Sequence, residues 1–184
     1  MVTGPAPHPP AHPPAHPSAA APVGTAREVA EQVTDPELPM LTLADLGVLR
    51  EVTERDGTVE VAITPTYSGC PALDAMRADL VARLHAAGYP DVRVRIALQP
   101  AWSTDWISPR GRTALAEHGI SPPGPAPRRS GPVPLTLAAP RRAVACPQCG
   151  SPAVELVSEF AATACKALYR CTACAEPFDH VKEI

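Results

Sequence analysis

Apolar and polar residues follow regular patterns in two stretches of this chain, residues 24–120 and residues 141–184. At the start of the first stretch, Thr25 followed by Glu28 forms a capping-box pattern, which is typical of a helix N-terminus. Pro36 disfavours a helical conformation in the residue before it, so the helix must end there. The pattern therefore predicts one short helix at the beginning of the first stretch.

The following segments predict a β-hairpin, a helix and a third strand. Residues 48–53 and 59–63 flank a turn at 55–57, and the pattern in 59–63 alternates so that Val59, Val61 and Ile63 fall on one face. Residues 71–87 carry apolar side chains at helical spacing, and residues 92–98 alternate again. The order α-β-β-α-β predicts a small two-layer α+β domain.

The only two tryptophans, Trp102 and Trp106, lie four residues apart. This spacing would place both rings on one side of a helical turn, where they either plug the core or form a docking surface. Ser108 and Pro109 then predict the start of a last short helix, which ends at Gly119.

Prolines divide the chain into parts. Of the 25 prolines, eight lie in a tail at 1–23 and seven in a linker at 121–140. Between and after them we expect a domain at 24–120 and a module at 141–184. The tail also repeats histidine every four residues, at His8, His12 and His16, but a proline-rich chain does not preorganise a metal site.

The charge of the chain excludes some classes of function. The formal net charge is −3, and residues 24–120 hold 14 acidic and 9 basic side chains, a balance of −5. A groove that binds phosphate needs the opposite sign, so we expect no nucleic-acid partner. No apolar run approaches the roughly 20 residues of a membrane span, and the N-terminus lacks a secretory signal. We therefore expect a cytoplasmic protein, in which cysteines are more often metal ligands than disulfides.

Four cysteines predict a metal site in the module at 141–184. They form two C-x-x-C pairs, and each pair is typical of a tight turn that delivers two thiolates to one ion, at Cys146, Cys149, Cys171 and Cys174. A module this small buries too little apolar surface to fold unaided. We expect a β zinc ribbon with strands at 154–160 and 164–170, and an iron-sulfur cluster is the alternative.

A fifth cysteine in the module, Cys165, has no place in a four-thiolate shell. On a regular strand it lies about 20 Å from Cys171, at about 3.3 Å per residue. It is then a separate thiol. If the strand bends instead, Cys165 becomes an additional ligand and an iron-sulfur cluster becomes credible.

The remaining cysteine, Cys70, stands alone in the first domain. Pro71 fits the first position of a helix, which would place Cys70 at the N-cap, where the helix dipole lowers a thiol pKa. The alternative is a buried, inert cysteine. A thiol enzyme would need a base nearby, but His85 lies about four turns away on the same predicted helix, and His118 cannot be placed.

Several motifs resemble known families. The segments 35–39, 45–48 and 66–71 are similar to the signature of the small iron-sulfur assembly domain. Longer matches at 64–71, 100–106 and 158–171 resemble the PaaD-like family of the bacterial phenylacetyl-CoA epoxidase system, a ring-1,2-epoxidase of aerobic phenylacetate breakdown.

The resemblance implies a non-catalytic accessory or maturation factor that helps to assemble iron or iron-sulfur centres in that oxygenase system. Its partners would be the catalytic and reductase subunits, and a homodimer is left open. Cys70 would transiently bind iron or a cluster, and Asp35, Glu37 and Asp45 would shape the acidic site. The alternatives are a stable structural or regulatory subunit of the oxygenase complex, an independent thiol enzyme, and a nucleic-acid-binding ribbon, which the acidic charge disfavours.

Overall fold

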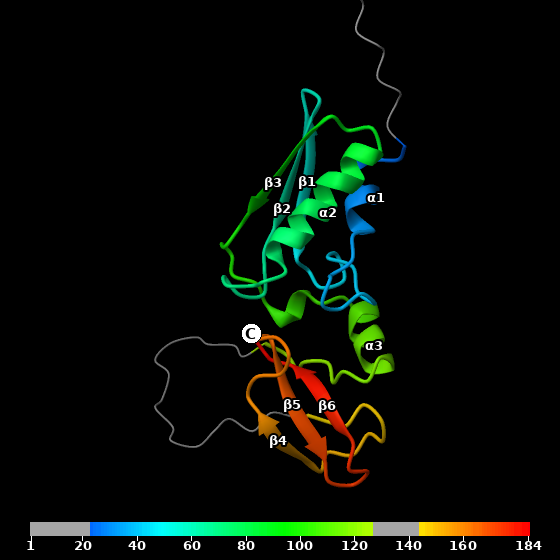
Figure 1. Cartoon of the computed structure of the whole chain (residues 1–184), viewed down its shortest axis with the longest axis vertical. Coiled ribbons are helices and arrows are strands. Elements are labelled where there is room, and N and C mark those ends of the chain that lie inside the picture. Colours follow the sequence, from blue (N-terminus) through cyan, green and yellow to red (C-terminus); the bar gives the residue numbers. More distant parts are fainter. Residues whose placement is uncertain (1–22, 127–143) are drawn as a thin grey trace, which may run out of the picture.

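The computed structural model describes residues 23–126 and 144–184. Figure 1 shows an elongated arrangement, with an α+β domain at one end and a three-stranded ribbon at the other. The predicted α+β fold with a C-terminal β module is confirmed. The predicted histidine tail, and residues 127–140 of the predicted linker, lie outside the described residues.

The N-terminal helix and the hairpin form where the sequence predicts them. Helix α1 (Ala26–Glu31) begins with the expected capping box, in which Thr25 Oγ1 accepts a hydrogen bond from the Glu28 backbone N–H at 3.2 Å. Strands β1 (Leu49–Arg55) and β2 (Thr58–Ile63) then pair antiparallel. The turn between them uses two residues with positive φ, Asp56 at 51° and Gly57 at 78°, which matches the twist of a tight hairpin.

The central helix and third strand complete the sheet. Helix α2 (Leu73–Ala86) connects β2 to β3 (Asp91–Ile96), which pairs parallel to β2, so the strand order is β1-β2-β3. Both α1 and α2 lie on one face of this sheet (Figure 1). Strand β2 lies in the middle of the sheet, and it carries most of the buried residues of the three strands. No helix in the described parts of the chain has the length and apolarity needed to cross a bilayer.

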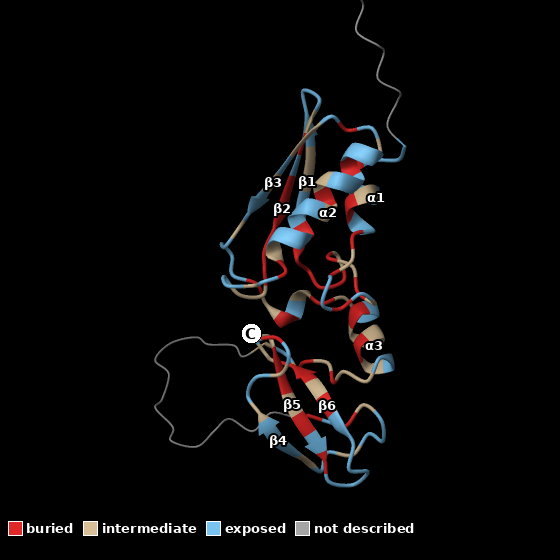
Figure 2. Cartoon of the chain, viewed as in Figure 1, coloured by how far each residue is buried: buried red, intermediate tan, exposed pale blue. Residues whose placement is uncertain are grey.

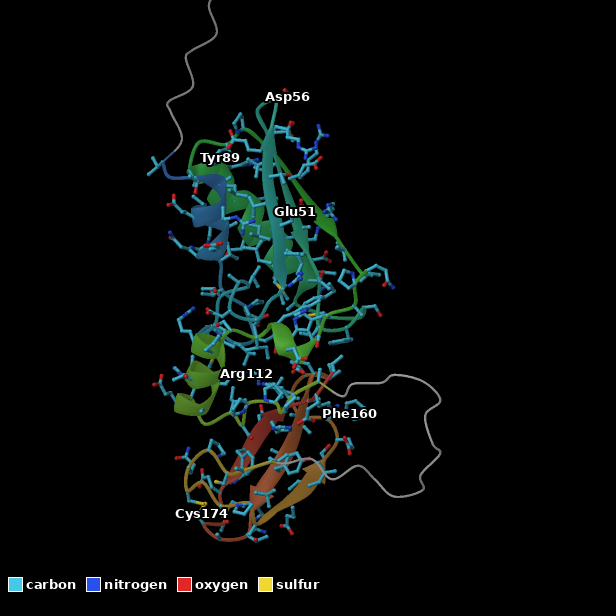
Figure 3. All side chains as sticks on the ribbon, turned by 180° about the vertical axis from the view of Figure 1, so that it is seen from behind. Glu51, Asp56, Tyr89, Arg112, Phe160 and Cys174 are labelled. Carbon is cyan, nitrogen blue, oxygen red and sulfur yellow. The ribbon has the colours of Figure 1, made fainter. Side chains whose placement is uncertain are left out.

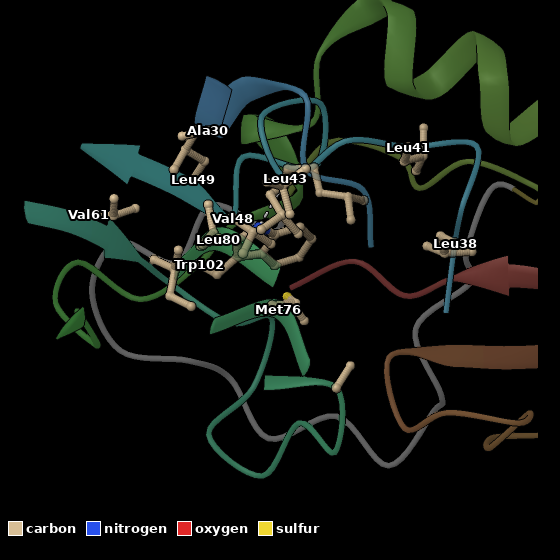
Figure 4. Close-up of a cluster of buried hydrophobic side chains, with 14 of the residues drawn as sticks. Ala30, Leu38, Leu41, Leu43, Val48, Leu49, Val61, Met76, Leu80 and Trp102 are labelled. Atoms are coloured by element: carbon tan, nitrogen blue, oxygen red, sulfur yellow. Dashed lines mark hydrogen bonds between the residues drawn. The ribbon is translucent and has the colours of Figure 1, made fainter. Parts of the chain in front are cut away.

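The two tryptophans separate in the structure. The ring of Trp102 is buried, and its indole Nε1–H donates to the Leu46 carbonyl at 2.9 Å (Figure 4). The ring of Trp106, in the short 3₁₀ helix η1 (Thr104–Trp106), is partly exposed and lies 3.6 Å from the Arg50 guanidinium carbon. The core-plug interpretation therefore holds for Trp102.

The last helix and the ribbon follow. Helix α3 (Pro109–Glu117) begins at the expected serine cap. The ribbon contains β4 (Val154–Ser158), β5 (Lys166–Cys171) and β6 (Pro177–Val181), all antiparallel in the order β4-β5-β6. Strand β6 was not predicted. Figure 2 shows that, among the ribbon strands, β5 and β6 carry the buried residues, whereas β4 is mostly exposed.

Hydrogen bonds join the two domains. The Ser121 N–H donates to the Asp179 carbonyl at 2.8 Å, and the Val181 N–H donates to the Ser121 carbonyl at 3.1 Å. At the C-terminus, the Thr104 N–H donates to the Ile184 carbonyl at 3.1 Å. Val181 also packs into the apolar core of the N-terminal domain. Strand β6 and the C-terminal residues are therefore attached to both domains.

Candidate metal centre and interdomain pocket

The four cysteines of the two C-x-x-C pairs converge at one point. All four sulfur atoms of Cys146, Cys149, Cys171 and Cys174 lie within 4.8 Å of one another. The Cys146 and Cys174 sulfurs are 3.7 Å apart, and the Cys149 and Cys171 sulfurs are 3.6 Å apart. A regular tetrahedron with metal–sulfur bonds of about 2.3 Å has edges of about 3.8 Å. The donor set therefore fits one tetrahedral ion.

The turns around these cysteines aim the sulfurs inward. In the first turn the Gly150 N–H donates to the Cys146 carbonyl at 2.8 Å, and Gly150 adopts a φ of 71°, which glycine tolerates best. In the second turn, hydrogen bonds from the Cys174 and Ala173 backbone N–H groups lower the pKa of Cys171 to about 7, whereas burial and the neighbouring sulfurs raise the pKa of Cys174 to about 12, so Cys171 is the more readily ionised of the two. A lowered pKa favours the thiolate that a metal ion requires.

The same geometry bears on the iron-sulfur alternative for the ribbon. Thiolates that bind different iron atoms of a cluster are separated more widely than the edges of a single tetrahedron. The tight grouping of the four sulfurs thus favours a mononuclear ion over a cluster. Figure 3 shows Cys174 at the end of the ribbon that lies away from the N-terminal domain.

Cys165 lies outside this four-cysteine group. It precedes β5 immediately, and its sulfur is 3.1 Å from the Thr163 hydroxyl oxygen. Its backbone carbonyl accepts a hydrogen bond from the Lys182 N–H at 3.0 Å, which ties it to the end of β6. Cys165 is therefore at the opposite end of β5 from Cys171.

A pocket between the two domains brings Cys165 and Cys70 together. The pocket has a volume of about 40 Å³. The N-terminal domain contributes Asp35, Glu37 and Cys70, and the ribbon contributes Thr163, Cys165 and Lys166. Its walls are mostly apolar and include Leu46, Val48, Met76, Trp102, Ile107 and Val181. Figure 4 shows the Met76 and Trp102 part of this wall.

The predicted N-cap position of Cys70 is wrong. Helix α2 begins two residues later than expected, with Ala72 as its N-cap. The pKa of Cys70 is raised, chiefly by burial and also by the charges of Asp35, Cys165 and Glu37, although a backbone hydrogen bond at Ala72 opposes the shift. The half-buried thiol is thus not activated as a nucleophile. Its negative neighbours favour a bound cation instead.

The predicted carboxylates separate into two locations. Asp35 is buried in the pocket wall, where its Oδ1 accepts hydrogen bonds from the Glu37 and Leu38 N–H groups at 2.8 and 2.9 Å. Burial raises the pKa of Asp35, although these hydrogen bonds lower it. Glu37 is exposed at the pocket.

Asp45 lies outside the lining of this pocket. Both of its carboxylate oxygens are engaged: Oδ2 accepts from the Thr42 hydroxyl at 2.7 Å, and Oδ1 accepts from the Ser108 hydroxyl at 3.0 Å and from Arg110 Nε at 2.8 Å. Arg110 also forms an ion pair with this carboxylate. Asp45 therefore fastens the start of α3 to the loop before β1.

Among the polar pocket residues that the sequence did not predict, two come from the ribbon. Thr163 contacts the Cys165 sulfur, and the ammonium group of Lys166 is buried and lies 2.9 Å from the Asp179 carboxylate. The only sequence signal for Lys166 was its position next to a cysteine, and nothing in the sequence around Thr163 indicated that it would line a pocket.

Comparison with known proteins agrees with this architecture. Residues 25–98 match the family described as iron-sulfur cluster assembly protein, and residues 130–182 match the PaaD zinc beta ribbon domain. The chain is 44% identical over 151 residues to an Escherichia coli K12 protein that is provisionally named as a component of 1,2-phenylacetyl-CoA epoxidase. That alignment covers 82% of this chain and 87% of the relative. The chain belongs to the PaaD family of phenylacetyl-CoA epoxidase components.

Further relatives match the N-terminal domain of this PaaD family member. An Fe-S protein maturation auxiliary factor from Porphyromonas gingivalis is 33% identical over 90 residues, which cover 48% of this chain and 82% of the relative. The solved structure of domain of unknown function DUF59 from Bacillus anthracis is 26% identical, covers 49% of this chain and 87% of that one, and has a TM-score of 0.46. The family match and the maturation factor support an accessory role in iron-sulfur assembly for the domain that contains Cys70.

Proposed function

We propose that this chain is a non-catalytic maturation factor that helps to assemble the iron or iron-sulfur centre of phenylacetyl-CoA epoxidase. The observation that carries the proposal is the position of Cys70, in an assembly-type domain, in a pocket that also contains Asp35 and Glu37. A thiol next to two carboxylates suits a transient iron cargo, since soft and hard iron ligands are both at hand.

Each part of the chain has a task in this proposal. Cys70 binds the cargo, and the carboxylates of Asp35 and Glu37 attract it. The apolar walls of the pocket limit the access of water. The four ribbon cysteines hold one zinc ion, which lets the small ribbon fold and dock on the recipient. The partners are the catalytic and reductase subunits of the oxygenase.

Intrinsic thiol catalysis has less support. Among the residues that the structure describes, no histidine lines the pocket of Cys70, so the thiol has no nearby imidazole base. The raised pKa of Cys70, chiefly due to burial, also disfavours a nucleophilic thiolate.

The second candidate is a stable structural or regulatory subunit of the oxygenase complex. The name of the Escherichia coli relative, which describes it as one of the epoxidase subunits, favours this candidate. It predicts co-purification of this chain with the catalytic subunits at fixed stoichiometry, and it predicts that replacing Cys70 by serine is harmless.

An assembly assay separates these candidates. The oxygenase components are expressed without this chain, with the wild-type chain, or with a Cys70→Ser variant, and the purified catalytic and reductase subunits are assayed for iron and turnover. Ser68→Ala is the matched control, because Ser68 lies two residues away and outside the lining of the pocket. A further sample contains fully metallated oxygenase and none of this chain.

The maturation proposal expects low iron and at least about tenfold lower turnover without the chain or with Cys70→Ser, and normal values with Ser68→Ala. It also expects the metallated oxygenase to turn over unaided. If the preloaded enzyme still requires this chain, the proposal is wrong and the stable-subunit candidate replaces it.

A further inference from the structure

The pocket between the domains contains both cysteines that the ribbon metal centre does not use. Cys70 comes from the loop before α2, and Cys165 from the residue before β5. Both are half-buried free thiols that line the same pocket of about 40 Å³. The two domains must therefore be docked for these thiols to share a space.

The charges around this pocket suit a cation. Asp35 and Glu37 bring two carboxylates. The one lysine among the lining residues, Lys166, has its ammonium group 2.9 Å from the Asp179 carboxylate, so its positive charge is already compensated. With one or both thiols ionised, the pocket carries a net negative charge that a metal cation or cationic cluster unit offsets.

The surroundings of Cys165 hold its sulfur in place. The Thr163 hydroxyl lies 3.1 Å from this sulfur and can donate a hydrogen bond to a thiolate. The Cys165 backbone is fixed by the Lys182 N–H, and the Lys166 N–H donates to the Thr163 carbonyl at 3.2 Å. Hydrogen bonds of this kind orient metal ligands and tune their basicity.

We propose that the sulfurs of Cys70 and Cys165 together bind the iron cargo, so that the ribbon supplies the second thiolate of the transfer site. This inference rests on the proposed function, because it takes iron as the cargo. Binding one ferrous ion converts two thiols to two thiolate ligands and releases two protons, with no change of oxidation state. A cluster unit binds by the same exchange of ligands.

The size of the pocket limits the form of the cargo. A volume of about 40 Å³ corresponds to a few water-sized positions, which admits one iron ion with water ligands or the edge of a small cluster. Two cysteines leave two positions of a tetrahedral iron open. An open coordination position is what a recipient protein needs in order to take the cargo over.

Iron binding by the full-length chain tests this inference. The ribbon is first loaded with zinc, and the protein is then titrated anaerobically with ferrous iron alone or with ferrous iron and sulfide. Bound iron per chain, retained zinc and the thiolate-to-iron absorption are measured for the wild type, Cys70→Ser, Cys165→Ser and the double variant. Ala164→Ser is the matched control, since Ala164 is exposed and adjacent to Cys165.

We expect each single variant to weaken iron binding at least about tenfold, the double variant to resemble the single variants, and Ala164→Ser to match the wild type. All variants should retain zinc. If iron binds more tightly in the titration without sulfide, the cargo is a ferrous ion. If it binds more tightly in the titration with sulfide, the cargo is a cluster. Normal binding by Cys165→Ser with lost binding by Cys70→Ser overturns this inference but leaves the proposed function standing. A wild type that binds no iron beyond its zinc in either arm overturns both.

A second measurement does not depend on cargo. A short bifunctional thiol reagent should join Cys70 to Cys165 in the folded, zinc-loaded protein, as detected by mass spectrometry of the linked peptides. Iron should protect against this reaction. If the reagent joins Cys70 to Cys165 only after the protein has been unfolded, the two cysteines do not share a site.

Discussion

Burial and negative neighbours together keep the thiol of Cys70 in its neutral form. Both effects raise its pKa above the ordinary value for cysteine. Because a raised pKa means a smaller thiolate fraction at a given pH, alkylation of Cys70 at pH 8 should be slower than that of an ordinary cysteine, and its rate should still be rising with pH above the ordinary cysteine pKa, where that of an unperturbed thiol levels off.

Replacing Asp35 tests this electrostatic account. Asp35→Asn removes one of the negative charges that raise the pKa of Cys70, so the thiolate fraction and the alkylation rate at pH 8 should rise several-fold. The rate is measured by mass spectrometry of the Cys70 peptide. Asp56→Asn is the control, because Asp56 lies in the exposed hairpin turn at the far end of the domain (Figure 3). Equal rates in wild type and Asp35→Asn would contradict the assignment.

The same variant has a predictable effect on stability. Burial raises the folded-state pKa of Asp35, so the folded protein binds its proton more tightly than the unfolded chain does. That contribution to the free energy of unfolding is present at low pH and is lost as the pH rises through the folded-state pKa. The stability of Asp35→Asn relative to wild type should therefore increase from pH 4 to pH 7 in urea unfolding. A constant difference over this range would be inconsistent with the raised pKa.

The sequence alone identified Cys70 as a candidate site residue but did not predict its chemical state. The N-cap argument depended on the helix starting at Pro71, and α2 starts two residues later. The largest effect that raises this pKa is burial, and the charge of Asp35 adds a smaller one; both come from residues that only the fold brings near. Local sequence therefore cannot give the direction of this pKa shift.

At the scale of elements, Gly47 fixes the packing of η1 against the loop before β1. Gly47 adopts a φ of 67°, and an added Cβ would lie 2.5 Å from Trp106 Cβ and 2.8 Å from the Trp106 carbonyl oxygen. Gly57 in the hairpin has a similar φ of 78°, but an added Cβ there meets nothing within 4 Å. A substitution at Gly57 would therefore introduce backbone strain alone, whereas one at Gly47 would introduce the same strain together with steric overlap.

Alanine at these two positions should destabilise the protein to different extents. Gly57→Ala should lower the free energy of unfolding by about 1–2 kcal/mol, the cost of a left-handed conformation for a residue with a Cβ. Gly47→Ala should cost at least about 1 kcal/mol more, because Trp106 must also move. Denaturant unfolding measures both, and equal losses would show that the loop absorbs the overlap without cost.

Elements with local signals were predicted well, and one without such a signal was missed. The capping box at Thr25 and the turn at Asp56 act within a few residues, so the sequence reveals them. Strand β6 is five residues long and begins at Pro177. Its formation depends on pairing with β5 and on the bridge to Ser121, which lies far away in the sequence.

For the whole molecule, the ribbon metal and the domain junction depend on each other. The described buried core of the ribbon is a small cluster made of Val144, Cys146, Ala167, Tyr169, Cys171 and Phe178. Two of these are cysteines of the metal site, so the ion replaces much of the core that so small a module lacks. When β5 and β6 are ordered, they hold Cys165 in place and allow the C-terminal part of the ribbon to form its hydrogen bonds with Ser121 and Thr104.

Removing the metal should therefore unfold the ribbon and separate it from the N-terminal domain. Cys146→Ser, or a strong chelator, should abolish the amide protection of β5 and β6 while β1 to β3 remain protected, as followed by hydrogen exchange. The loss should be complete, because zinc binding supplies about 10–16 kcal/mol of apparent free energy in small zinc modules. Cys165→Ser is the control and should keep both the bound metal and the amide protection. A ribbon that stays protected without metal would refute this coupling.

The sequence by itself determined the α+β domain, the hairpin, the ribbon cysteines and the resemblance to its family, because each rests on short spacings or long motifs. The tertiary structure decided where Cys165 lies. The strand β5 carries it away from Cys171, and the docking of the ribbon through β6 brings it into the pocket of Cys70. That juxtaposition depends on contacts between residues in different domains, and spacing along the chain contains no record of them.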